Sequence, residues 1–305
     1  MTDSHSITRR AAVKLGAAFG ISQALPAFAD DTMLTRPIPG STESLPVIGL
    51  GTYSVFDVAG SEAEIAERRA IVAKLVDAGG SVIDTSPMYN RSEAVIGKVL
   101  DEGGLRASSF LATKVWIDGA DAGRRQMQAS ADLMGAERVD LMQVHNRRDL
   151  EVHWPTILAA QEAGTIRYNG VTDYRESAID SMMTIMRETK PEFIQMNYSL
   201  GERALDQRLL PLAQDLGIAV LINRPFMSGR LFQAVNGVSL PDWASEFAQS
   251  WGQFFLKYIV SHPAVTCVIP ATSKLRHMID NAGAGMGPMP DEATRRRMVT
   301  FVESL

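Results

Sequence analysis

The chain has 305 residues, of which 46% are hydrophobic, enough for a sizeable core and compatible with an α/β barrel folded as one domain. Its formal net charge of −5 gives no basis for nucleic acid as a partner, because nucleic-acid binding depends on clustered positive charge. The single cysteine, Cys267, excludes an intrachain disulfide and a metal site built from several thiolates.

The N-terminal segment resembles a twin-arginine export signal. An arginine pair at 9–10 precedes an apolar stretch at 15–25, which is too short to span a bilayer, and a small-x-small cleavage site follows at 27–29. Such signals usually carry a large apolar residue where this chain has Ala12. A basic tail or a membrane anchor is the competing interpretation.

The order of these features nevertheless favours a signal peptide. We therefore expect residues 1–29 to be read by the twin-arginine (Tat) export machinery and residues 30–45 to form a linker. The protein would then be periplasmic or otherwise exported, with no stable membrane anchor.

From residue 46 to residue 305, short apolar runs alternate with amphipathic stretches. The expected strands are 47–50, 82–84, 110–114, 141–144, 167–171, 193–196, 219–222 and 265–269. The expected helices are 65–78, 91–100, 123–134, 158–163, 176–186, 206–216, 243–260, 274–281 and 294–302. This alternation implies a parallel sheet with both faces covered. Since no break in composition divides the region, we expect a single-domain (β/α)8 TIM barrel over residues 46–305.

Four chemically related side chains follow three successive strands of this barrel. They are Asp84, Tyr89, Lys114 and His145. Active sites of such barrels lie at the C-terminal ends of the strands, so we expect the four to meet. An ammonium lowers a tyrosine's pKa, a carboxylate keeps a lysine charged, and a neutral imidazole donates a hydrogen bond. Together they form a general acid, although each alone could be a packing or helix-capping residue.

These residues lie in motifs that resemble the aldo-keto reductase superfamily. The motifs are 49–53 (GLGTY), 83–89 (IDTSPMY), 112–114 (ATK), 141–145 (LMQVH), 166–172 (IRYNGVT), 194–198 (IQMNY) and 268–273 (VIPATS). The resemblance implies NAD(P)H-dependent reduction of an aldehyde or ketone to an alcohol. It also implies that Tyr89 is the proton donor, that Asp84 and Lys114 tune it, and that His145 orients the carbonyl.

The resemblance implies a nicotinamide site on several strand ends. Its residues would be Gly51, Thr52, Thr172, Asp173, Gln195 and Asn223. Asp173 stands where the family usually has asparagine, and a carboxylate lacks the NH2 donor of that side chain. Asn223 stands where many members place an aromatic ring under the nicotinamide. Arg224 and Phe226 are candidates to replace that ring.

Two further segments are implied to contact the phosphates and the adenosine. They comprise Ser228, Gly229, Arg230 and Leu231 beside the pyrophosphate, and Thr272, Ser273, Lys274, His277 and Asn281 around the adenosine and its 2′-phosphate. Backbone N–H groups, an arginine and a helix N-terminus all favour anions. Lys274 favours NADP(H), whereas His277 replaces a frequent arginine and leaves NAD(H) possible.

The substrate pocket is less specified. Tyr53, Trp116 and Asn146 lie in loops at strand ends and are candidate contacts for a small carbonyl substrate, with loop packing as an equal alternative. His153 and His262 lack clustered partners, so no metal is indicated. A nucleotide-binding redox sensor or accessory subunit with little turnover is the alternative function. The intact set of four residues favours the enzyme.

Overall fold

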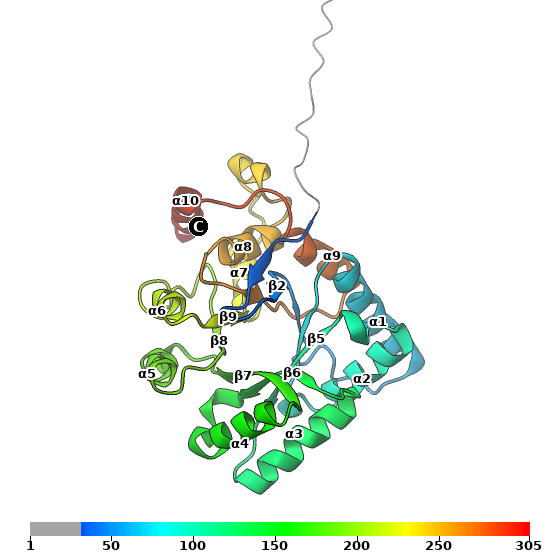
Figure 1. Ribbon diagram of the computed structural model, residues 1–305. Helices are drawn as coiled ribbons and strands as arrows, with labels where there is room; N and C mark the ends of the chain where they lie inside the picture. Colours follow the sequence, from blue (N-terminus) through cyan, green and yellow to red (C-terminus); the bar gives the residue numbers. More distant parts are fainter. Residues whose placement is uncertain (1–31) are drawn as a thin grey trace, which may run out of the picture.

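The computed structural model describes residues 32–305 and contains the expected barrel (Figure 1). The parallel strands are β3 (Leu50–Gly51), β4 (Val82–Asp84), β5 (Phe110–Val115), β6 (Val139–Val144), β7 (Ile166–Thr172), β8 (Phe193–Asn197), β9 (Ala219–Asn223) and β10 (Cys267–Val268). Each strand pairs with its neighbour in sequence order. Parallel bridges from Ile48 to Val268 and from Gly51 to Ala271 join the first strand to the last, so the sheet closes on itself.

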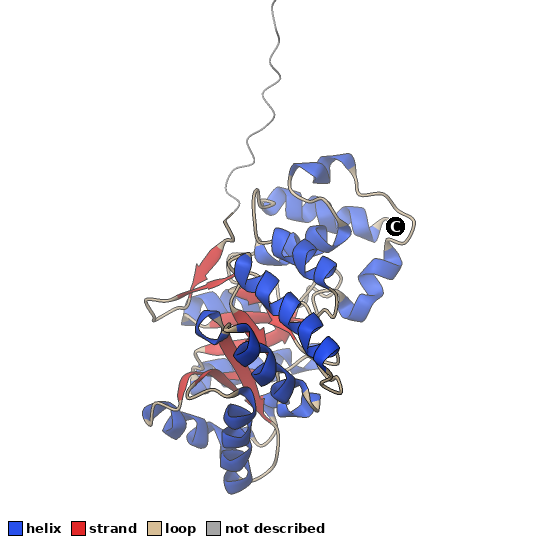
Figure 2. Cartoon of the chain, turned by 90° about the vertical axis from the view of Figure 1, so that its right-hand side faces the viewer, coloured by secondary structure: helices blue, strands red, loops and turns tan. Residues whose placement is uncertain are grey.

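Helices enclose the strands, as Figure 2 shows with the strands in red. They are α1 (Glu62–Asp77), α2 (Ser92–Gly103), α3 (Ala120–Met134), α4 (Leu150–Glu162), α5 (Ile179–Thr189), α6 (Leu209–Leu216), α7 (Arg230–Ala234), α8 (Trp251–Val260), α9 (Leu275–Gly283) and α10 (Glu292–Glu303). Because helices cover the outer face and side chains fill the interior, every residue of β4, β5 and β8 is buried.

Local sequence signals set several helix boundaries. Ser61 and Glu64 form a capping box at the start of α1. Gly135 and Gly217 end α3 and α6 in the left-handed conformation, which costs glycine little because it has no Cβ. Ser250 caps α8 through the backbone N–H of Gln253, so the helix expected over 243–260 is divided at this point.

The helix expected over 158–163 is also longer than predicted. It is α4, which begins at Leu150 and contains Pro155. Its inward face buries His153 and Ile157, one turn apart, against the sheet. Tertiary burial therefore extends the helix towards its N-terminus despite the proline.

Residues 35–46 form a hairpin in place of the expected linker. Strand β1 (Thr35–Pro37) pairs antiparallel with β2 (Ser44–Pro46). Ile38 and Leu45 are buried with Phe110 and Phe193, the first residues of β5 and β8. The hairpin thus covers the N-terminal end of the barrel, opposite the end where the candidate catalytic residues lie.

The expected signal peptide at 1–29 lies outside the described residues. Within residues 32–305, none of the helices combines the length and the apolar character needed to cross a membrane.

Candidate active site

The structure brings Asp84, Tyr89, Lys114 and His145 together at the C-terminal ends of β4, β5 and β6. Asp84 is the last residue of β4, and Tyr89 ends the short 3-10 turn that follows it. Lys114 is the penultimate residue of β5, and His145 follows β6 directly. Adjacent parallel strands end at the same edge, which is why residues far apart in the sequence converge.

A buried ion pair joins two of these residues. Lys114 Nζ donates to Asp84 Oδ1 at 2.6 Å and to the carbonyl oxygen of Thr85 at 2.6 Å. The second carboxylate oxygen, Asp84 Oδ2, accepts from Gln195 Nε2 at 2.9 Å and from Gln143 Nε2 at 3.3 Å. Burial lowers the pKa of Lys114, but Asp84 and Tyr89 outweigh it and the net pKa is raised. Lys114 is therefore a cation at neutral pH.

Tyr89 lies over this cation. Lys114 Nζ is 5.1 Å from the centroid of the Tyr89 ring. Burial raises the pKa of Tyr89, and the charge of Lys114 acts in the opposite direction without cancelling it. Lys114 does lower the pKa of Tyr89, as expected, but the prediction that the net pKa is lowered is wrong. Burial removes water from the phenolate, and this cost exceeds the stabilisation that the ammonium provides.

His145 is a neutral imidazole beside Tyr89. The two ring centroids are 6.0 Å apart. Burial, reinforced by the charge of Lys114, lowers the pKa of His145 to about 3. Ser86 Oγ lies 3.1 Å from His145 Nδ1 and accepts from the backbone N–H of Met88 at 3.2 Å. The serine hydroxyl can donate to Nδ1, and in the corresponding tautomer the imidazole proton is on Nε2. That N–H is the donor that a substrate oxygen needs.

Two of the candidate substrate residues border this pair. Tyr53 is exposed and contacts Tyr89 edge-on, with ring centroids 5.1 Å apart. The Trp116 ring centroid lies 6.3 Å from that of His145. Asn146 follows His145 with a positive φ of 53°, a left-handed conformation that asparagine tolerates better than most residues. Tyr53 and Trp116 thus flank the proton-donating groups.

The carboxylate of Asp173 is fully engaged by two arginines. It accepts from Arg147 Nε at 2.8 Å and from Arg175 Nε and Nη2 at 3.0 and 2.8 Å, as well as from backbone N–H groups of residues 174 and 175. Burial raises the pKa of Asp173, but Arg175 and Arg147 outweigh it and lower the pKa to about 2. Sequence reasoning missed both partners, although each arginine lies within four residues of a strand end.

Gln195 and Asn223 extend the same polar network. Asn223 Nδ2 donates to Gln195 Oε1 at 3.3 Å and to the carbonyl oxygen of Asp173 at 3.4 Å. The guanidinium of Arg224 lies 5.4 Å from the ring centroid of Tyr174. The ring of Phe226 lies 4.9 Å from that of Phe232. The guanidinium of Arg224 and the ring of Phe226 therefore each already pack against another aromatic side chain.

The first loop of the implied cofactor site is closely packed. Thr52 is buried, and its hydroxyl donates to the carbonyl oxygen of Asp84 at 3.0 Å. A Cβ added to Gly51 would lie 2.7 Å from the carbonyl oxygen of Ile269. The glycine therefore allows β3 to approach the segment after β10.

The loop implied to face the pyrophosphate turns sharply at Ser228 and Gly229. Their φ angles are 55° and 90°. Arg230 begins α7 and donates to Glu202 Oε1 at 2.8 Å, and Leu231 is buried in the core. Arg230 is thus an ion-pair partner of a carboxylate, in addition to being a candidate phosphate ligand.

The segment implied to face the 2′-phosphate carries several exposed side chains that can donate hydrogen bonds. Thr272 accepts from the backbone N–H of Lys274 at 3.1 Å, which sets the turn into α9. Lys274, Arg276 and His277 are exposed at its N-terminus, near Ser273, whereas Asn281 is buried further along the helix. Sequence analysis did not include Arg276 among the phosphate-binding candidates. Its position directly before His277 is the feature of the sequence that could have indicated it.

Comparison with known proteins places this geometry in a family. Residues 47–296 match the model of the aldo/keto reductase family. The chain belongs to the aldo/keto reductase family. This membership confirms the predicted superfamily, the barrel fold and the expectation of an oxidoreductase of this kind.

Individual relatives are more distant. Methylglyoxal reductase YeaE of Escherichia coli is 29% identical over 252 residues, which are 78% of this chain and 85% of that protein. Glyoxal reductase of Bacillus subtilis is 25% identical and covers 78% of this chain and 82% of its own length. A Klebsiella pneumoniae aldo-keto reductase, solved in complex with NADPH, is 24% identical with a TM-score of 0.74 and covers 88% of this chain and 96% of its own. The last comparison shows a shared fold.

The engaged carboxylate of Asp173 leads to a prediction about pH and stability. The pKa of Asp173 is lower in the folded protein than its value of 3.8 in the unfolded chain, so the ionised carboxylate stabilises the fold fully above about pH 3.8. This contribution is lost as the pH falls towards about 2 and the carboxylate is protonated. Asp173→Asn should lower the free energy of unfolding at pH 7 by roughly 2 kcal/mol. The difference from the wild type should close between pH 4 and pH 2, as measured by urea unfolding.

Asp118→Asn provides the matched control. Asp118 pairs with Arg148, but its side chain is 71% exposed. We expect little or no change in stability, because solvent screens exposed ion pairs. Equal effects of the two substitutions would show that the buried position of Asp173 is unimportant.

Proposed function

We propose that the protein reduces a small aldehyde or ketone to the alcohol with NADPH, and that Tyr89 is the proton donor. The observation that carries the proposal is the buried group in which Lys114 is held by Asp84 and lies under Tyr89, with neutral His145 alongside. This is the arrangement that a carbonyl oxygen requires when negative charge develops on it.

The side chains divide the work of the reaction. NADPH, when bound, supplies the hydride that adds to the carbonyl carbon. The carbonyl oxygen then takes the phenolic proton of Tyr89, so the alcohol forms and a phenolate remains until solvent returns a proton. Lys114 stabilises that phenolate, and the Nε2–H of His145 holds the oxygen beforehand.

The raised pKa of Tyr89 fits this order of events. Before the reaction the phenol stays protonated, since burial disfavours its anion. The attraction of Lys114 acts on the phenolate only as the proton leaves, so it is stronger in the transition state than in the ground state. Interactions of that kind accelerate a chemical step.

Several features support NADPH as the cofactor. Lys274 and Arg276 are exposed at the N-terminus of α9, where a phosphate is favoured by charge and by the helix dipole. The left-handed residues Ser228 and Gly229 turn the backbone beside α7. The relatives named methylglyoxal reductase and glyoxal reductase support a small carbonyl substrate.

Tyr89→Phe tests the assignment of the proton donor. The variant should lose carbonyl reduction by about 100-fold or more, because a positioned proton donor contributes at least that factor. NADPH binding, followed by quenching of protein fluorescence, should stay within about twofold, since a single buried hydroxyl changes little else. Unchanged turnover of methylglyoxal or other aldehydes would contradict the proposal.

Absence of turnover by the wild type would have a different meaning. If the wild type binds NADPH but reduces nothing in an aldehyde and ketone panel, the sensor function is favoured over the enzyme.

Lys274→Ala tests the preference for NADPH over NADH. Loss of one charge-assisted hydrogen bond to the 2′-phosphate should raise the dissociation constant of NADPH by about tenfold. The dissociation constant of NADH should stay unchanged, because NADH lacks that phosphate. Tighter binding of NADH than of NADPH by the wild type would contradict the preference.

We also propose that residues 1–29 are a twin-arginine signal and that the protein is exported. The arginine pair, the apolar stretch and the cleavage site in that order support this. Because this route carries folded proteins, the cofactor can travel in its bound form.

Replacing Arg9 and Arg10 by lysine tests the export proposal. The double variant should stay in the cytoplasmic fraction of a host with a twin-arginine route, whereas Arg36→Lys should be exported like the wild type. Export of the double variant, or a wild-type protein that never leaves the cytoplasm, would contradict the proposal.

A further inference from the structure

Asn223, the last residue of β9, has a buried acceptor without a partner. Its Nδ2 donates to Gln195 Oε1 and to the carbonyl oxygen of Asp173. Exchanging the amide oxygen and nitrogen would set an oxygen against these two oxygens, so the orientation of the amide is fixed. Asn223 Oδ1 then has no hydrogen bond within the described part of the chain, although it is buried. A buried acceptor in this position is costly unless a ligand or an ordered water donates to it.

The neighbouring side chains are already engaged in hydrogen bonds within the protein. The carboxylate of Asp173 is occupied by Arg147 and Arg175. Gln195 uses its Nε2 on Asp84 and its Oε1 on Asn223. Both carboxylate oxygens of Asp173 are thus committed to internal hydrogen bonds, and Gln195 has only the second lone pair of its Oε1 left to accept with.

The strand beside Gln195 supplies a complementary donor. Thr172 is the residue opposite Gln195 in the pairing of β7 with β8, and it is buried. Its Oγ1 accepts from the backbone N–H of Asn146 at 3.5 Å and donates to no group in residues 32–305. A primary amide presents an N–H donor and a carbonyl acceptor, which match the oxygen of Asn223 and the hydroxyl of Thr172.

We infer that Asn223 Oδ1 accepts a hydrogen bond from the carboxamide NH2 of the nicotinamide, in the position where the family usually stacks an aromatic ring. Thr172 donates to the carboxamide oxygen. The inference rests on the proposed function, and it makes Asn223 a binding residue for the amide edge of the ring rather than for its face. Asn223 is connected to the reacting groups through Gln195 and Asp84, which places it beside them.

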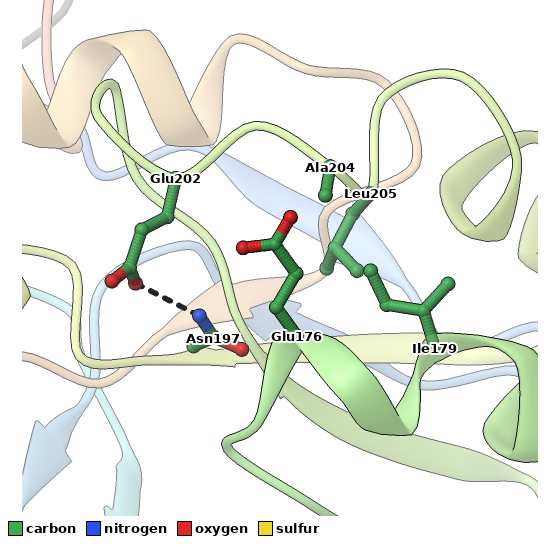
Figure 3. A pocket seen from close by; sticks show the side chains of 6 residues that line it. All are labelled: Glu176, Ile179, Asn197, Glu202, Ala204 and Leu205. Atoms are coloured by element: carbon green, nitrogen blue, oxygen red, sulfur yellow. Dashed lines mark hydrogen bonds between the residues drawn. The ribbon is translucent and has the colours of Figure 1, made fainter.

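A second asparagine shows why the inference is specific to Asn223. Asn197 is the residue opposite Asn223 in the pairing of β8 with β9, and its Oδ1 also lacks a partner. Figure 3 shows Asn197 in a separate pocket, where its Nδ2 donates to Glu202 Oε2 at 2.8 Å. That pocket has a volume of about 10 Å³, which admits one water molecule and no ring. Asn223 does not line it.

The test compares NADP+ with its 3-acetylpyridine analogue, in which an acetyl group replaces the carboxamide and removes the NH2. Wild-type protein should bind NADP+ about fivefold more tightly, the factor that one net hydrogen bond contributes. Asn223→Leu, which is close in size and has no acceptor, should reduce this ratio to about one by weakening NADP+ alone.

Asn197→Leu is the matched control and should leave the ratio at the wild-type value. The inference is overturned by equal wild-type affinities for the two dinucleotides, which would mean that water satisfies Asn223. It is also overturned if Asn223→Leu weakens both dinucleotides alike, or if Asn197→Leu changes the ratio as much. Failure of wild-type protein to bind NADP+ at all would refute the proposed function itself, which separates the two results.

Discussion

The buried ion pair between Lys114 and Asp84 is the constraint on which the rest of the site depends. Removing two charges from water costs more than their attraction returns, unless further hydrogen bonds satisfy both ions. Here the extra partners are the carbonyl oxygen of Thr85 and the amides of Gln143 and Gln195. They come from β6, from β8 and from the loop after β4, so the pair is satisfied only when the strands have closed into a barrel.

That constraint also explains the opposing effects on Tyr89. The same lack of water that makes Lys114 a strong local charge raises the pKa of the phenol. A solvated lysine would neither perturb the tyrosine nor require Asp84. Burial of His145 keeps the imidazole neutral at working pH, so no second cation competes for the carbonyl oxygen. The site is thus a balance between desolvation and charge, in which desolvation dominates until the proton moves.

The sequence predicted the features that are local and missed those that depend on distant contacts. All eight strands were recognised from short apolar runs, and the convergence of the four candidate catalytic residues was expected from their places at strand ends. The hairpin at 35–46 was missed because its three-residue strands end in Pro37 and Pro46 and lack an apolar alternation. The net pKa shift of Tyr89 was missed because it depends on tertiary burial. Arg147, the more distant partner of Asp173, was missed because no spacing rule joins the loop after β6 to the loop after β7.

The two unusual residues of the nicotinamide side, Asp173 and Asn223, form one arrangement. A buried carboxylate at 173 needs cationic partners, and Arg147 and Arg175 supply them. Once its oxygens are so occupied, Asp173 offers a ligand neither the donor of an asparagine nor an accessible acceptor. An aromatic ring at 223 would then leave Gln195 Oε1 without the hydrogen bond that it now accepts from Asn223. The small polar side chain at 223 satisfies Gln195 Oε1 and leaves its own buried Oδ1 without a partner among residues 32–305.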